Sequence, residues 1–160
     1  MRRAAVLVSA LAVILLTVGV GAQAPSFAGK WTMVPDPNAA PAGGGRGGGR
    51  GGGAVSGAEV TITQDATTIT IAKMQGQNPV TLKYTLDGKE SKNTVQGKGG
   101  AVVQSSMAKV EGPKLTITTT ADMGRGPTTT KQSLWIEGGN LMVENFGADG
   151  ASTGKLTYKK

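Results

Sequence analysis

The sequence predicts an all-β fold, an antiparallel up-and-down meander of about ten short strands. Threonine alternates with Val, Ile and Leu over many short stretches, a period-2 pattern that is typical of half-buried strands. Turn residues such as Gly, Asp and Pro separate most of these stretches, roughly every 8–14 residues, as in an antiparallel meander. No helical periodicity occurs beyond the N-terminal apolar segment. A chain of 160 residues with 26 glycines and 4% aromatic residues fits one such domain.

The first segment has the organisation of a secretory signal peptide. Arg2 and Arg3 precede an apolar run over residues 4–18, and small residues follow it. This run is shorter than the roughly 20 apolar residues of a membrane-spanning helix, so an uncleaved anchor is the weaker alternative. Loss of both arginines would lower the formal charge from +7 to +5, since all ten acids lie downstream. The sequence therefore predicts an exported protein, periplasmic or secreted.

The mature domain is expected to span residues 23–160. Cleavage after Ala22 fits best, because cleavage two residues later would place Pro25 at the new N-terminus. The chain contains no His and no Cys, which removes the usual general base, the commonest metal ligand and any thiol nucleophile. Without disulfides, an exported domain depends on apolar burial and hydrogen-bonded strands.

The first expected strand covers residues 27–33 and stands apart from the others. Phe27, Gly29 and Trp31 share one of its faces, because side chains alternate across a strand. Its expected role is to close the sheet by pairing with the last strand.

A Gly/Arg-rich loop follows at about residues 36–57 and contains the repeat GGGRGGGRGGG. Such a composition buries too little side chain to offset its ordering entropy, so we expect a flexible, solvated loop. Arg46 and Arg50 in this loop resemble the RGG segments that contact polyanions. With Arg125 in a later loop, they are candidate contacts for an anionic envelope polymer, and export argues against nucleic acid as the partner.

The next three expected strands show a clear alternation of apolar residues with threonine. They cover residues 59–63, 68–71 and 80–86. Asp87-Gly88 then fits a tight primed turn, so the third of these strands is expected to form a hairpin with a weaker strand at 91–96.

Five more strands complete the expected meander. The strand beginning at Leu115 is among the cleanest, whereas the one before it is irregular because Val102 and Val103 are adjacent. The inward face of the strand that contains Trp135 is ambiguous, since both of its faces mix polar and apolar residues. These strands cover residues 101–110, 115–120, 128–137, 140–146 and 154–159.

Closure of the meander into a barrel is expected, because an open sheet would expose two long edges. The element Phe27-x-Gly29-x-Trp31, the meander with Asp-Gly hairpins and the final basic strand at 155–159 resemble the calycin group, that is, lipocalins and fatty-acid-binding proteins. The resemblance is greatest to lipocalin-like exported proteins of bacteria and covers most of residues 26–160. It implies a lipocalin-like or fatty-acid-binding-protein-like barrel.

The resemblance also sets expectations for particular residues. In lipocalins, the tryptophan of the Gly-x-Trp element plugs one end of the barrel and an arginine of the last strand covers it. This chain has lysines there, and the stem of Lys155 or Lys159 could cover the indole of Trp31. Fatty-acid-binding proteins hold a carboxylate with an arginine and a tyrosine two residues apart. Lys155 and Tyr158 are three apart and point to opposite faces, so that ligand chemistry does not carry over.

The resemblance implies a non-enzymatic binding domain for a small apolar or amphipathic ligand. Candidate lining residues are Trp31, Tyr84, Met107 and Trp135, unless these side chains only fill a packed core. The alternative is a basic surface-interaction protein that contacts anionic envelope or matrix polymers through its Gly/Arg-rich loop.

An enzyme has little support in the sequence. It shows no metal-ligand cluster, nucleophile elbow or phosphate-binding loop. Glu137 and Glu144 flank a predicted hairpin and could approach each other as paired carboxylates do in glycosidases, although such acids are more often solvated hairpin ends. We therefore expect no catalytic activity and no cofactor or metal.

Overall fold

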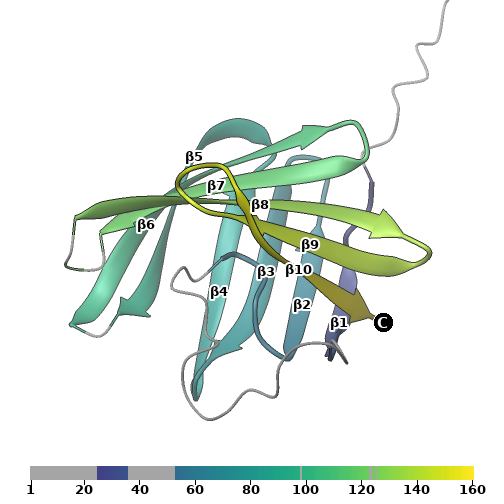
Figure 1. Cartoon of the computed structure of the whole chain (residues 1–160), viewed down its shortest axis with the longest axis horizontal. Coiled ribbons are helices and arrows are strands. Elements are labelled where there is room, and N and C mark those ends of the chain that lie inside the picture. The colour runs from purple at the N-terminus through teal and green to yellow at the C-terminus, as the bar shows by residue number, and fades with distance from the viewer. Residues whose placement is uncertain (1–24, 36–52, 98, 123, 125) are drawn as a thin grey trace, which may run out of the picture.

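The computed structural model describes residues 25–35, 53–97, 99–122, 124 and 126–160, which form an all-β barrel (Figure 1). Ten strands in this part of the chain make one antiparallel sheet, in the order β4-β3-β2-β1-β10-β9-β8-β7-β6-β5. The predicted up-and-down meander is thereby confirmed. The strands are β1 (Gly29–Val34), β2 (Glu59–Gln64), β3 (Thr68–Gln75), β4 (Asn78–Thr85), β5 (Asp87–Gly97), β6 (Gly100–Glu111), β7 (Lys114–Asp122), β8 (Pro127–Glu137), β9 (Asn140–Phe146) and β10 (Ser152–Lys159).

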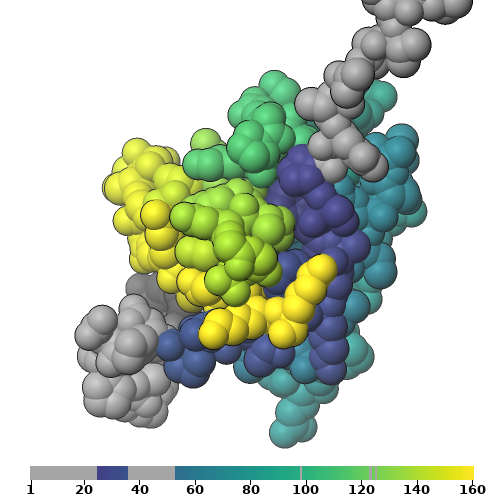
Figure 2. All heavy atoms as spheres, turned by 90° about the vertical axis from the view of Figure 1, so that its right-hand side faces the viewer, coloured from purple at the N-terminus to yellow at the C-terminus, as the bar shows by residue number. Residues whose placement is uncertain are grey.

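The first strand joins the two halves of the sheet, as the sequence predicted. β1 pairs with β2 on one side and with β10 on the other, where Met33 lies opposite Tyr158. Figure 2 shows β1 in purple between teal residues of the following strands and yellow residues of the C-terminus. The strand begins at Gly29 rather than Phe27. Phe27 is nevertheless fully buried, and the side chain of Gln64 accepts a hydrogen bond from its backbone nitrogen at 2.8 Å.

The prediction that the strands on either side of Asp87-Gly88 pair as a hairpin is wrong. The chain reverses there, but β4 and β5 lie at opposite ends of the strand order and share no ladder among the described residues. A side chain bridges the two strands instead. Asn93 Oδ1 accepts a hydrogen bond from Lys83 N at 2.8 Å, and its Nδ2 donates to Lys83 O at 3.0 Å. The amide of Asn93 thus substitutes for the backbone of a paired strand.

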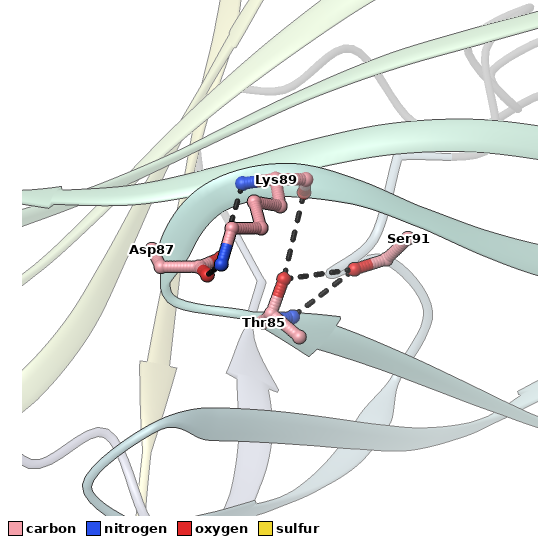
Figure 3. A network of polar contacts seen from close by, with 4 residues as sticks. All are labelled: Thr85, Asp87, Lys89 and Ser91. Carbon is pink, nitrogen blue, oxygen red and sulfur yellow. Dashed lines mark hydrogen bonds and ion pairs between the residues drawn. The ribbon is translucent and has the colours of Figure 1, made fainter.

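A second group of contacts holds the β4–β5 reversal itself (Figure 3). Thr85 N donates to Ser91 Oγ at 3.1 Å. Asp87 accepts a hydrogen bond from Lys89 N and forms an ion pair with Lys89 Nζ at 2.8 Å. These contacts with Lys89 lower the pKa of Asp87 to about 2. Side chains therefore complete the barrel where the ladder is missing.

The interior is mostly apolar and is enclosed by the two halves of the sheet. In Figure 1, β6 to β9 run across β2 to β4, and buried side chains of both groups belong to one apolar cluster. The ambiguous strand β8 turns Gln132 and Leu134 inward and Trp135 outward. The largest fully buried side chains are Trp31, Tyr84, Tyr158, Phe27, Ile62, Ile69, Ile71, Leu82, Leu115, Ile117, Leu134 and Leu141.

The expected signal peptide lies outside the described residues, and so does the GGGRGGGRGGG repeat except for its last glycine, Gly53. Within the part of the chain that is described, no helix has the length and apolar character needed to cross a membrane.

Candidate ligand site in the barrel interior

Residues 53–57, here called the inner segment, pack into the barrel. Ala54 is 3% exposed and Val55 is fully buried, and both belong to the same apolar cluster as the strands. The prediction that the solvated loop extends to residue 57 is therefore wrong at this end. Ala54 and Val55 follow three glycines in the sequence, and their side chains supply the apolar surface that the glycines lack.

Gln132 binds the backbone of the inner segment much as a neighbouring strand would. Its Oε1 accepts a hydrogen bond from Val55 N and its Nε2 donates to Val55 O, both at 2.9 Å. Gln132 is only 3% exposed, so these bonds lie away from water. Tyr158 Oη adds a hydrogen bond to Gly57 O at 3.1 Å. The barrel interior thus already holds a short piece of its own chain through polar contacts.

Lys73 brings an amine into this interior. It lies two positions after Ile71 on β3, and the period-2 alternation of a strand turns it toward the same side. Its Nζ donates to Gly53 O and, at 2.9 Å, to Ser56 Oγ. Burial lowers the pKa of Lys73 to about 8, and none of the described carboxylates forms an ion pair with it.

A cavity of about 90 Å³ remains beside Lys73. Gln104 is 4% exposed as a residue and lines this cavity, but among the described residues the only enclosed side-chain N or O atom without a hydrogen-bond partner is Oε1 of Gln75. The Nε2 atom of Gln75 donates to Gln96 O at 3.0 Å. The cavity lining therefore includes a polar atom that the described chain leaves unsatisfied. Its lining residues are Ser56, Lys73, Met74, Gln75, Leu82, Val95 and Gln104.

Trp31 and Tyr84 lie inside the barrel and each is 1% exposed, but neither lines the cavity beside Lys73, so their role as ligand contacts stays a prediction. Trp31 Nε1 donates to Phe27 O at 2.9 Å. Lys160 Nζ lies 5.0 Å from the centroid of the Trp31 ring, so the residue that covers the indole is Lys160, not Lys155 or Lys159 as expected. Burial raises the pKa of Tyr84. Both aromatic side chains act here as parts of the packed core.

Met107 and Trp135 lie on the outer surface, so their prediction as interior lining is wrong. Met107 is 52% exposed. The Trp135 ring lies between two lysine ammonium groups, at 4.8 Å from Lys114 Nζ and 5.5 Å from Lys155 Nζ, and its Nε1 donates to Glu137 Oε2. Each residue falls on the outward phase of its strand's alternation.

The other candidates from the sequence are not brought together. Arg46, Arg50 and Arg125 lie outside the described residues, so a polyanion contact there stays a prediction. Glu144 lies opposite Ser133, whereas Glu137 lies opposite Asn140, so the two acids sit four positions apart along the β8–β9 ladder. At about 3.3 Å per residue this separation is too long for a carboxylate pair.

Sequence reasoning missed the residues that give the interior its polarity: Lys73, Gln75, Gln104 and Gln132. The signal that could have found them is their phase along the strands. Lys73 and Gln75 continue the inward alternation of Ile69 and Ile71, and Gln132 shares its face with Leu134. A charged or amide side chain in phase with core residues is a candidate for an interior site.

The described residues contain no group of three or more His, Cys, Asp or Glu side chains placed to hold a metal ion.

Comparison with known proteins concerns the fold. No protein-family model matches the chain, and no curated protein matches it. Among solved structures, a mutant of the fluorescent protein UnaG is similar, with a TM-score of 0.48 and 21% sequence identity over 64% of this chain and 70% of that chain. At that level the likeness carries no argument. The strand order, with β1 paired to both β2 and β10, is that of an antiparallel up-and-down barrel, as the sequence predicted.

Proposed function

We propose that the chain is an exported, non-enzymatic binding domain that takes a small amphipathic molecule into the barrel interior. The observation that carries this proposal is the polar wall inside an otherwise apolar barrel. Burial of a polar side chain without a hydrogen bond costs free energy, so a purely structural core is expected to avoid it. The buried polar side chains on inward strand positions are Asn93, Gln104, Ser106, Thr119 and Gln132.

The inward polar side chains of this wall that have hydrogen-bond partners lie outside the cavity lining. Ser106 and Thr119 hydrogen-bond to each other at 2.9 Å, and Asn93 bridges β4 and β5. Gln104 and the Oε1 atom of Gln75, which have no partner among the described residues, line the cavity. The groups without partners therefore gather where space remains, which is the arrangement expected of a binding site rather than of a core.

The size of the remaining space favours a small ligand. The cavity of about 90 Å³ is well below the roughly 300 Å³ of typical drug-sized sites. A long-chain fatty acid would have to displace the inner segment and its hydrogen bonds to Gln132, Lys73 and Tyr158. A short amphipathic molecule can enter without breaking them.

A two-tryptophan chain allows a simple binding experiment. The Trp135→Phe variant leaves Trp31, inside the barrel, as the only tryptophan of the sequence. We would titrate it with butanol, butyramide and butyrate, and with palmitate as a long-chain comparison, and follow both Trp31 fluorescence and amide chemical shifts. Saturable changes on inward positions of β3 to β6 are expected with the short molecules. The proposal fails if none of the short molecules gives a saturable change.

Export belongs to the same proposal and rests on the N-terminal Arg2-Arg3 and apolar pattern. Expression of the full chain in a bacterial host should yield a processed form in the periplasmic or secreted fraction that begins at Gln23. A chain that stays unprocessed inside the cell would contradict this part.

A further inference from the structure

We propose that the cavity at Lys73 is a binding site for a small hydroxycarboxylate, a short organic acid that carries a hydroxyl group near its carboxylate. This inference rests on the proposed function and names the ligand chemistry of the same site. It combines three features of the cavity: one cation, one amide without a partner and one lone acceptor beside an apolar wall.

The cation is the Lys73 ammonium. An ammonium has three N–H groups, and those of Lys73 serve Gly53 O and Ser56 Oγ, which leaves one without an acceptor among the described residues. The described carboxylates pair with other lysines or with none, so the charge of Lys73 is not balanced within this part of the chain. A partly buried cation without a counter-ion is unfavourable, and an anion that enters the cavity would offset that cost. The ligand is therefore expected to carry a negative charge.

Gln104 supplies an amide to the same cavity. Its exposed fraction is 4%, and it lines the same cavity from β6 as Lys73 does from β3. An amide NH₂ is a neutral donor that can share a carboxylate with an ammonium. The two residues therefore fit the two oxygens of one carboxylate.

Gln75 Oε1 requires a different group. Its Nε2 is fixed by the bond to Gln96 O, so the Oε1 atom is the end of the amide that lacks a partner. A carboxylate oxygen cannot donate to it, but a hydroxyl group can. An ammonium, as in an amino acid, could also donate, yet it would bring a second positive charge close to Lys73. A hydroxyl satisfies Gln75 without that repulsion.

The apolar part of the cavity lining and the cavity volume indicate the apolar group and the size of the ligand. Leu82 and Val95, both almost fully buried, contribute the hydrophobic side of the cavity. A volume of about 90 Å³ holds only a few heavy atoms, less than the engineered cavity of roughly 150 Å³ that takes a benzene ring. A three- or four-carbon hydroxy acid such as lactate matches this size, with its methyl group toward Leu82 and Val95.

The test uses three ligands of nearly equal size: lactate, propionate, which lacks the hydroxyl group, and alanine, which replaces it with an ammonium. Binding to the mature domain would be measured by calorimetry and by the side-chain NH₂ signals of Gln75 and Gln104. Lactate should bind at least about tenfold more tightly than either analogue, which corresponds to one hydrogen bond made or lost in a buried site. Equal binding of all three would overturn the role of Gln75, and with it the proposal.

Variants test which residues hold the acid. Gln104→Leu keeps the side-chain size and should weaken lactate binding about tenfold, and Lys73→Met should weaken it at least as much. Lys73 also holds the inner segment, so Lys73→Met could impair folding. The Gln104 side chain makes no hydrogen bond to a described residue, so Gln104→Leu is expected to fold normally. The matched control is Lys83→Met, an exposed lysine on β4, which should leave lactate affinity unchanged. Lactate binding that survives Gln104→Leu, or that Lys83→Met reduces equally, contradicts the site.

The outcome separates this inference from the proposed function. If butanol or butyramide binds the interior but lactate gives no saturable signal, the hydroxycarboxylate site is wrong while the binding domain stands. If none of these molecules binds, both proposals are wrong and the cavity holds water only.

Discussion

At the scale of single residues, Lys73 gives the folded domain an unusual dependence on pH. In the folded chain its pKa is about 8, whereas its ordinary value of 10.5 applies when the chain unfolds. Between these values the unfolded state binds more protons, so the free energy of unfolding rises with pH. Above about pH 10 the buried Tyr84 and Tyr158 act in the opposite direction, because their pKa values are raised by burial and they ionise first in the unfolded state.

We therefore predict that the wild-type domain gains about 2 kcal/mol of unfolding free energy between about pH 8 and pH 10. Urea unfolding at several pH values would measure it. The Lys73→Met variant should lose this slope, while Lys83→Met should keep it. A flat profile in the wild type would mean that Lys73 is solvated rather than buried.

Gly29, the first residue of β1, has a backbone conformation that favours glycine. Its φ of +150° is rarely adopted by residues with a side chain, and a Cβ atom there would lie 2.8 Å from Lys160 Cε. Gly29→Ala should lower the free energy of unfolding by about 1–2 kcal/mol and displace Lys160 from the Trp31 ring. Urea unfolding with Trp31 fluorescence in a Trp135→Phe background measures both effects. Gly99→Ala is the control, since a Cβ at Gly99 meets no atom within 4 Å. Equal effects of the two substitutions would contradict the argument.

At the scale of elements, the inner segment is held by hydrogen bonds to three side chains, of which Gln132 binds both backbone groups of Val55. Gln132→Met removes both hydrogen bonds to Val55 but keeps the side-chain size, which leaves a buried N–H and C=O without partners. The expected loss is about 2–4 kcal/mol of unfolding free energy, and the Val55 amide should exchange with deuterium much faster. Gln96→Met, at an exposed position on β5, should change neither quantity. If Val55 stays protected in the Gln132 variant, apolar packing alone holds the segment.

The gap between β4 and β5 is the second element that depends on a side chain. Asn93→Leu removes both hydrogen bonds to Lys83, so the Lys83 amide should exchange faster, with a loss of about 1–3 kcal/mol. Thr94→Ala, the exposed neighbour on the same strand, should leave that amide protected. Protection that persists in Asn93→Leu would show that the strands pair without the bridge.

At the scale of the whole molecule, the sequence was sufficient for the architecture. Alternation of Val, Ile and Leu with Thr marked the ten strands, and the isolated Trp31 strand indicated closure against the last one. Local patterns determine these features, so a single sequence reveals them. The ladder missing after Asp87-Gly88 was not foreseen, because a turn signal does not say whether the strands beside it pair or diverge.

The interior site was harder to predict for a physical reason. Lys73, Gln104 and Gln132 are polar residues in strands, and composition alone suggests that such residues face water. Only their phase relative to Ile71, Ala108 and Leu134 shows that they point inward. The inner segment was hidden in a different way. It ends a glycine-rich stretch, and its burial depends on Gln132, which lies 77 residues further along the chain.

The proposed binding domain takes up a small amphipathic molecule in the interior beside Lys73. The most direct measurement is a set of intermolecular NOEs between the tightest short-chain ligand and the methyl groups of the labelled domain. Contacts to Leu82 and Val95, which line the cavity, are predicted, with none to the exposed Met107. Contacts confined to Met107 and other outward methyl groups, or no contacts from a ligand that does bind, would contradict the claim.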